Sequence, residues 1–121
     1  KPEQCKEIQK FASVIKAFGI SDTLPSNIDF YQDYCNYFLF DTKGENYGGN
    51  GLAFDHSVLS DYKLSVPFFL SGGIEPKDSG YLNQLNHSMY YAVDINSKFE
   101  TAPGIKDISK IKQFTKDLNR I

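Results

Sequence analysis

The strongest constraint on the fold is a fourfold alternation of short apolar runs with helical segments. The runs cover residues 13–20, 36–41, 66–70 and 89–96, and the spacing of roughly 20 to 30 residues is typical of strands connected through helices. Strands that alternate with helices pair in parallel, joined by crossover connections. Two α/β architectures fit: an open sheet, or part of a (β/α)8 TIM barrel, whose full length is about 250 residues. Four units amount to half of such a barrel.

Helices are expected before, between and after these strands. An amphipathic helix at the start would place Cys5, Ile8 and Phe11 on one face, and Ser21 offers N-cap chemistry for a second helix. Pro76 suits an early position in another helix. The expected helices span residues 2–11, 21–34, 57–62, 75–86 and 108–118, with a compact turn at 101–107.

Length and charge exclude several classes of protein. A chain of 121 residues with 40% hydrophobic residues can bury the core of one domain. Its 13 Lys plus Arg and 15 Asp plus Glu give a net charge of −2, with no block of like charges. This balance argues against nucleic acid or an anionic membrane as the main partner. No apolar stretch approaches the length of a membrane span, and no signal leader opens the chain.

The cysteines and histidines show no metal-binding pattern. Cys5 and Cys35 lie far apart without a C-x-x-C motif, so we expect plain thiols, no metal and a cytoplasmic protein. His56 and His87 stand next to turn signals without partners at ligand spacing, which indicates structural or bystander roles. Phe38, Phe40, Phe68 and Phe69 belong to the predicted strands and are expected in the core.

Polar and glycine-rich chemistry gathers where the predicted strands end, which is where α/β folds bind ligands. Ser71-Gly72-Gly73 could turn backbone N–H groups toward an anion, and Asn96 with Ser97 would supply a second wall. Plain turn geometry is the competing explanation for the glycine pair. Asp41 is the natural candidate for acid–base work, against an N-cap or turn role, while Asp94 suits a substrate hydroxyl or a helix cap.

A glycine-rich stretch follows Asp41 and lacks periodicity. It runs from residue 42 to 55 and includes Gly48, Gly49 and Gly51. Long loops inside a compact domain are usually functional, so we expect a mobile loop near the ligand.

These motifs, in this order, resemble the phosphoribosylanthranilate isomerases of tryptophan biosynthesis. The matching segments are VIKAFGI at 14–20, FLFDTK at 38–43, YGGNGLAFD at 47–55, FFLSGGIEP at 68–76, VDINSKFE at 93–100 and APGIKD at 102–107. The resemblance implies the C-terminal half of a single TIM-barrel domain, from the fourth helix to the eighth, over residues 1–121. The N-terminal half would be absent, consistent with a chain that opens without a Met.

The resemblance also implies an activity: the cofactor-free Amadori rearrangement of N-(5′-phosphoribosyl)anthranilate to 1-(2-carboxyphenylamino)-1-deoxyribulose 5-phosphate, an isomerisation of the intramolecular oxidoreductase type. The family's general acid falls on Asp41. Gly72 and Gly73 fall on phosphate-binding amides, and Asp94, Asn96 and Ser97 on the eighth-strand part of the substrate site. The glycine-rich loop corresponds to the loop that covers the substrate.

Two departures from the family pattern bear on activity. The usual Ser-Ser-Gly of the eighth strand is Asn96-Ser97-Lys98 here. The family's general base, a first-strand Cys, and its anthranilate-binding Arg would lie in the absent half, and neither Cys5 nor Cys35 fits that motif. We therefore expect the chain alone to be inactive or nearly so, and to associate with itself or with the missing half through its open strand edges.

Two alternatives stay open on sequence alone. One is another phosphosugar-binding TIM-barrel enzyme, such as a ribulose-phosphate epimerase or an indole-glycerol-phosphate synthase, although Asp41 followed by a glycine-rich loop suits the isomerase better. The other is a non-catalytic phosphate-binding half-barrel module. The sequence that precedes Lys1 would distinguish these two readings. A Cys on the first strand and an Arg after it would favour the isomerase, and the absence of both would favour the module.

Overall fold

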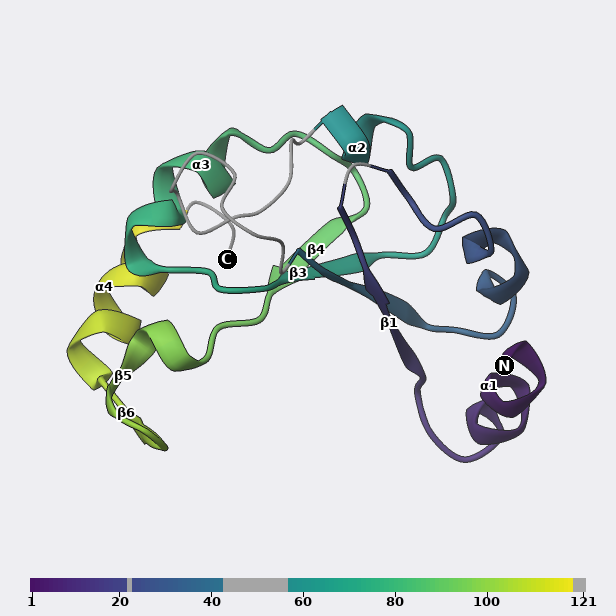
Figure 1. The fold of residues 1–121 in the computed structure, drawn as a ribbon, viewed down its shortest axis with the longest axis horizontal. Coiled ribbons are helices and arrows are strands. Elements are labelled where there is room, and N and C mark those ends of the chain that lie inside the picture. Colours follow the sequence, from purple (N-terminus) through teal and green to yellow (C-terminus); the bar gives the residue numbers. More distant parts are fainter. Residues whose placement is uncertain (22, 43–56, 119–121) are drawn as a thin grey trace.

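A four-stranded parallel sheet organises the chain (Figure 1). The computed structural model describes residues 1–21, 23–42 and 57–118. The strands lie side by side in chain order and are β1 (Ile15–Gly19), β2 (Tyr37–Asp41), β3 (Phe68–Ser71) and β4 (Tyr90–Val93). All three pairings are parallel, as the alternation of strands and helices predicts.

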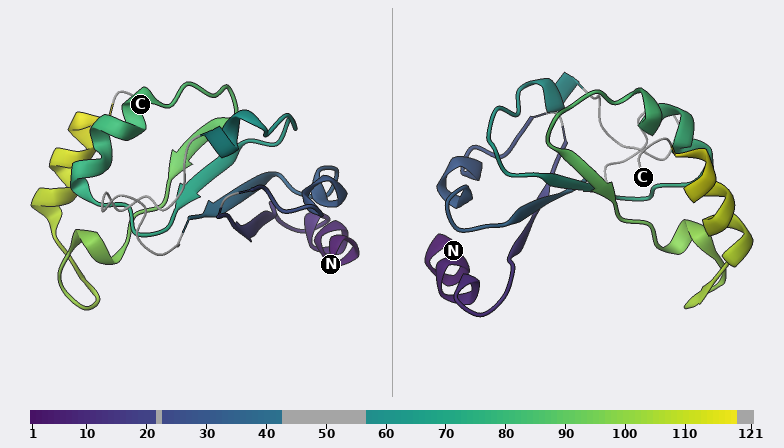
Figure 2. Two further views of the ribbon diagram at one scale, coloured as in Figure 1. Left: turned by 45° about the horizontal axis from the view of Figure 1, so that its top comes forward. Right: turned by 180° about the vertical axis from the view of Figure 1, so that it is seen from behind.

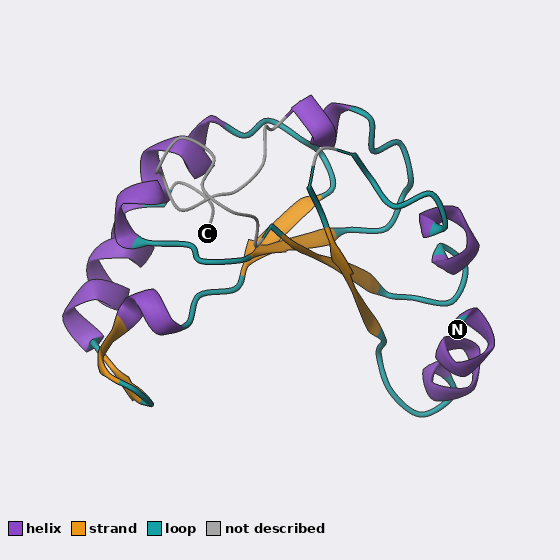
Figure 3. Ribbon diagram, in the orientation of Figure 1, coloured by secondary structure: helices purple, strands orange, loops and turns teal. Residues whose placement is uncertain are grey.

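The helices follow one another along an arc around this sheet (Figure 1, Figure 2). Figure 3 shows them as short elements separated by long connections. Within the described residues, none is long and apolar enough to cross a membrane. The helices are α1 (Pro2–Gln9), η1 (Ile28–Tyr31), α2 (Ser57–Ser60), η2 (Pro76–Asp78), α3 (Ser79–Gln84), η3 (Ser97–Phe99) and α4 (Ile108–Asp117), where η marks a 3-10 helix.

Three predicted connections differ from the structure. The helix expected over 21–34 is only the 3-10 turn η1, because Pro25 lacks an N–H and holds the residue before it in an extended conformation. The helix expected over 75–86 opens with η2 and ends at Gln84. The turn expected over 101–107 forms part of an antiparallel hairpin of β5 (Glu100–Ala102) and β6 (Ile105–Lys106), reversed at Gly104, whose φ is +81°.

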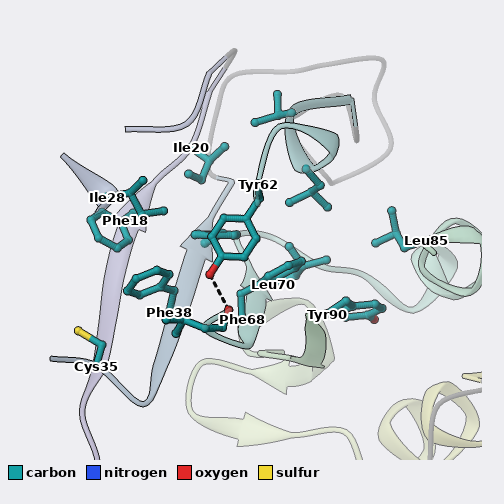
Figure 4. Packing of buried hydrophobic residues seen from close by; sticks show 14 of the residues in the cluster. Phe18, Ile20, Ile28, Cys35, Phe38, Tyr62, Phe68, Leu70, Leu85 and Tyr90 are labelled. Atoms are coloured by element: carbon teal, nitrogen blue, oxygen red, sulfur yellow. Dashed lines mark hydrogen bonds between the residues drawn. The ribbon is translucent and has the colours of Figure 1, made fainter. Parts of the chain in front are cut away.

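One face of the sheet carries the core. Side chains alternate between faces along a strand, and Phe38 and Phe40 of β2 and Phe68 of β3 point toward the helices and are completely buried. The rings of Phe40 and Phe68 stack with centroids 4.9 Å apart. Tyr62, after α2, packs edge-on against both and donates a hydrogen bond of 2.5 Å to the carbonyl of Val66 (Figure 4). The prediction that these phenylalanines form the core is confirmed for all three.

The opposite face of the sheet is only partly covered by the described residues. Tyr37, Phe69 and Tyr91 meet there, with ring centroids 5.1 to 5.6 Å apart, and Tyr91 is 56% exposed. The prediction of a core position is therefore wrong for Phe69, which is half-buried on this face. The continuous apolar run at residues 36–41 also predicts a strand covered on both faces. The described residues do not provide that cover on this second face.

The apolar face predicted for the first helix is also exposed in part. Cys5 of α1 is buried, but Ile8 is 52% exposed and Phe11, which follows the helix, is 88% exposed. The helix does form, because Pro2 occupies its first turn and Glu3 complements its N-terminal dipole. Its amphipathic pattern nevertheless extends beyond the surface that the described residues bury.

Candidate functional site

A cavity of about 270 Å³ opens at the carboxyl ends of β2, β3 and β4. It receives side chains from three consecutive strand ends, as ligand sites of parallel α/β folds do. The residues predicted for catalysis and for substrate or phosphate binding all line it. The lining consists of Asp41, Ser71, Gly72, Gly73, Ile74, Asp94, Asn96, Ser97 and Lys98.

Strand register explains why these residues meet. Asp41, the last residue of β2, is the register partner of Ser71, the last residue of β3. Beyond the end of β4, the N–H of Asp94 donates to the carbonyl of Leu70 at 2.7 Å, which continues the ladder by one step. The Ser71 hydroxyl then donates to Oδ2 of Asp94 at 3.1 Å. The carboxyl groups of Asp41 and Asp94 thus lie on either side of the Ser71 hydroxyl, which is hydrogen-bonded to Asp94.

The turn after β3 supplies backbone donors. Gly72 and Gly73 have φ angles of +107° and +70°, which side chains with a Cβ rarely adopt. Glycine lets a ligand approach the backbone closely, and the N–H groups of such a turn can bind an anion. The helix expected to add its dipole begins only at Pro76, and as a 3-10 turn. Anion binding here would therefore rest on the amides of the turn rather than on a helix terminus.

Thr42 anchors this glycine turn to β2. Its side chain is completely buried, and its hydroxyl donates to the carbonyl of Ser71 at 2.8 Å. Its backbone N–H donates to the same carbonyl at 2.9 Å. One residue therefore ties the position next to Asp41 to the start of the glycine turn. Sequence reasoning missed this role, because the bond joins two residues that lie 29 positions apart in the chain.

The part of the cavity that follows β4 is stabilised by the β5–β6 hairpin. Lys106 donates from Nζ to Oδ1 of Asn96 at 2.7 Å and forms an ion pair with Glu100. This hydrogen bond from Lys106, together with the N–H of Gly104 at 3.3 Å, holds the pKa of Glu100 below its usual value. No local sequence pattern predicts this bridge, because it depends on the hairpin that brings Lys106 next to Asn96.

The chemistry of the cavity suits an anionic ligand with hydroxyl groups. Lys98 adds a positive charge, the glycine turn adds N–H donors, and Asp41 and Asp94 can exchange a proton or accept hydroxyl groups. Among residues 1–21, 23–42 and 57–118, no group of three His, Cys, Asp or Glu side chains could hold a metal ion. An acid next to an anion cradle can protonate a substrate held by its anionic group.

Other residues considered from the sequence lie elsewhere. His87 lines a larger cavity, of about 510 Å³, beside the amino ends of β3 and β4. Its Nδ1 accepts the N–H of Met89 at 3.0 Å and its Nε2 lies 3.2 Å from the carbonyl of Tyr62, which gives it the structural role expected. Gly48, Gly49, Gly51 and His56 lie outside the described residues.

The two cysteines are free thiols buried in the core, away from the cavity. Burial and the neighbouring Cys5 raise the pKa of Cys35 to about 12. A thiol that holds its proton this firmly is a poor base or nucleophile at neutral pH.

Comparison with known proteins gives one consistent family. A family model described as N-(5′-phosphoribosyl)anthranilate (PRA) isomerase matches residues 2–117. The chain is 43% identical to an N-(5′-phosphoribosyl)anthranilate isomerase of Parabacteroides distasonis, over 97% of this chain and 54% of that protein. It is 38% identical to the enzyme of the same name in Phocaeicola vulgatus, over 98% of this chain and 59% of that protein.

Solved structures agree with the sequence matches. The phosphoribosyl anthranilate isomerase of Thermotoga maritima superimposes with a TM-score of 0.70 at 32% identity, over 97% of this chain and 56% of that one. The corresponding structure from Thermus thermophilus gives a TM-score of 0.69 at 26% identity, over 97% of this chain and 55% of that one. The chain thus spans just over half the length of the relatives it matches.

Proposed function

Because the chain belongs to the N-(5′-phosphoribosyl)anthranilate isomerase family, we propose that it forms the second half of that family's (β/α)8 barrel. It would supply the acid and the phosphate site for the rearrangement of N-(5′-phosphoribosyl)anthranilate. The observation that carries this proposal is the convergence of Asp41, Gly72, Gly73, Asp94, Asn96 and Ser97 on one cavity at the carboxyl ends of three strands. Four parallel strands in chain order, with one face only partly covered by the described residues, also suit half of a closed barrel.

In this proposal the substrate phosphate lies against the glycine turn. The N–H groups of Gly72 and Gly73 donate to its oxygens, Ser97 and Asn96 donate from the next strand end, and the charge of Lys98 offsets part of its negative charge. Asp94, fixed by the Ser71 hydroxyl, is placed to accept a ribose hydroxyl. Holding the phosphate fixes the ribose ring relative to Asp41.

Asp41 acts as the general acid. It gives its proton to the furanose ring oxygen as the bond from C1′ to that oxygen breaks, and the nitrogen lone pair forms the Schiff base. A general base then removes the proton from C2′, and the resulting enol tautomerises to the ketone, so that no atoms are gained or lost. Asp41 lies at the end of β2 and lines the same cavity as the glycine turn, which supports this assignment.

The base that removes the C2′ proton comes from outside these 121 residues in this proposal. The two thiols are buried in the core, and neither lines the cavity. Because the family's base is a first-strand Cys, which neither thiol matches, the chain alone is expected to be inactive or nearly so, and to associate with itself or with the other half of the barrel. The sheet face around Phe69 and Tyr91, which the described residues cover only in part, and the edge strands β1 and β4 would provide the surface for this.

The experiment is turnover of phosphoribosylanthranilate, followed by the loss of its fluorescence, in a protein extended to the length of its relatives. The Asp41→Asn variant should lose activity about a hundredfold or more, as removal of a general acid does. Asp33→Asn, a change of the same kind at an exposed position outside the cavity, is the matched control and should leave the rate unchanged. An inactive parent, or an active Asp41→Asn variant, would refute the proposal. An inactive parent that still binds ribose 5-phosphate would indicate another phosphosugar enzyme or a non-catalytic module.

A further inference from the structure

The side chain of Asn96 is hydrogen-bonded to a residue outside the cavity. Its side-chain oxygen accepts a hydrogen bond of 2.7 Å from Nζ of Lys106. A lysine ammonium has three donors and no acceptor, so the atom of Asn96 that faces it must be the oxygen. The amide group is planar, and its nitrogen therefore points away from Lys106. None of the described residues accepts a hydrogen bond from that nitrogen, while Asn96 itself lines the cavity.

Lys106 is in turn fixed by the hairpin that carries it. It forms an ion pair with Glu100, the first residue of β5, and Glu100 and Lys106 are register partners across the hairpin. The other carboxylate oxygen of Glu100 accepts the N–H of Gly104 at 3.3 Å. The N–H of Asp107 donates to the carbonyl of Phe99 at 2.7 Å, and the N–H of Phe99 donates to the carbonyl of Asn96 at 2.9 Å. The hairpin is thus joined to the cavity wall by both backbone and side chains.

We propose that Lys106 is a positioning residue, which turns the Nδ2 group of Asn96 into the cavity as a donor to the substrate phosphate. The inference rests on the proposed function, because it assigns an additional donor to the phosphate site of that reaction. A free asparagine amide can present either its oxygen or its nitrogen to a ligand. The oxygen would repel phosphate, so fixing the amide with its oxygen on Lys106 favours the anion.

The same geometry accounts for the Asn96-Ser97-Lys98 sequence. A serine hydroxyl rotates to suit its ligand and needs no partner to orient it, whereas an asparagine amide needs one. Lys106 supplies that partner from ten residues away. The presence of Asn96 where the family usually has a Ser therefore changes how the hydrogen-bond donor is oriented and does not remove the donor.

The test is a titration of the ¹⁵N-labelled full chain with inorganic phosphate, followed by NMR. The readouts are the backbone N–H signals of Gly72 and Gly73 and the side-chain NH₂ pair of Asn96, which is assigned by its absence in Asn96→Ala. Phosphate should shift both sets of signals in the unmodified chain. Asn96→Ala should weaken phosphate binding about tenfold, the lower end for loss of a hydrogen bond to a charged group. Lys106→Met should weaken it about threefold to tenfold.

A double-mutant cycle separates positioning from a direct charge effect. If Lys106 acts through Asn96, then Asn96→Ala combined with Lys106→Met binds phosphate no more weakly than Asn96→Ala alone. Lys110→Met removes an equal charge from an exposed position in α4 and should change nothing, while Lys106→Arg should restore part of the affinity.

Three results would overturn the inference. Additive losses in the cycle would show that Lys106 acts by its charge alone, and an NH₂ pair that ignores phosphate while Gly72 and Gly73 shift would show that Asn96 is not a donor. Gly72 and Gly73 signals that do not shift at all would refute the proposed phosphate site, and this inference with it.

Discussion

Removing the buried hydroxyl of Thr42 should both destabilise the chain and loosen the proposed phosphate site. The hydroxyl donates to the Ser71 carbonyl at 2.8 Å in a completely buried position. Valine has nearly the same shape but no donor. A hydrogen bond of this kind contributes about 1 kcal/mol to stability. The Ser71 carbonyl keeps the N–H of residue 42 as a partner at 2.9 Å, so no further penalty for an unpaired group is expected.

The free energy of unfolding of Thr42→Val should therefore fall by about 1 kcal/mol. Urea unfolding followed by circular dichroism measures this, and the midpoint should drop by about 0.3–1 M. The Ser71-Gly72-Gly73 turn would lose one of its anchors to β2, so the affinity for inorganic phosphate should fall about threefold, which corresponds to part of the energy of that bond.

Thr42→Ser is the matched control. It keeps the hydroxyl but removes a buried methyl group, which costs about 1 kcal/mol. The two variants should thus be destabilised to a similar extent, yet only Thr42→Val should bind phosphate more weakly. A Thr42→Val variant as stable as the unmodified chain, or equal phosphate affinities in the two variants, would refute the role assigned to this hydroxyl.

Two further predictions concern stability and association. Burial raises the pKa of Asp78 above its ordinary 3.8, so the folded state keeps that proton to a higher pH than the unfolded chain does. Its contribution to stability is therefore present at low pH and is lost as the pH rises above 3.8. Asp78→Asn should remove this pH dependence from urea midpoints measured at a series of pH values from 3.8 upward. An unchanged slope would contradict the assignment. Ile15 is 49% exposed on the edge strand β1, and Ile15→Lys should reduce self-association in light scattering, since a charge opposes edge-to-edge pairing; association as strong as before would exclude the β1 edge.

The parallel sheet could be predicted because its strands are marked by local composition. The run at 36–41 contains β2 and the run at 66–70 overlaps β3, and the alternation with helices fixes their parallel pairing. The cavity followed from the same premise, because the carboxyl ends of neighbouring parallel strands must lie together. Asp41, Gly72 and Asp94 were placed in one site on that ground, and the structure brings them into one cavity.

The features that could not be predicted depend on contacts between segments far apart in the sequence. The bridge from Lys106 to Asn96 requires the β5–β6 hairpin, and the residues that form it predict only a turn. The bond from Thr42 to Ser71 spans 29 residues. The predicted helix over 21–34 is wrong: Ser21 is a favourable N-cap residue, but Pro25 disfavours a helical conformation at the residue before it. Local sequence patterns identify secondary-structure elements, while tertiary contacts decide how long each element is and which of its faces are buried.

The most direct test of the account is to locate where the chain binds a phosphorylated sugar. Ribose 5-phosphate is titrated into the ¹⁵N-labelled chain, with unphosphorylated ribose as the control, and the backbone signals are mapped. The account predicts shifts centred on Gly72, Gly73 and Ser97, at the carboxyl ends of the strands, with ribose 5-phosphate only. Shifts centred on Lys63 and His87, which line the larger cavity at the opposite end of the sheet, would contradict it.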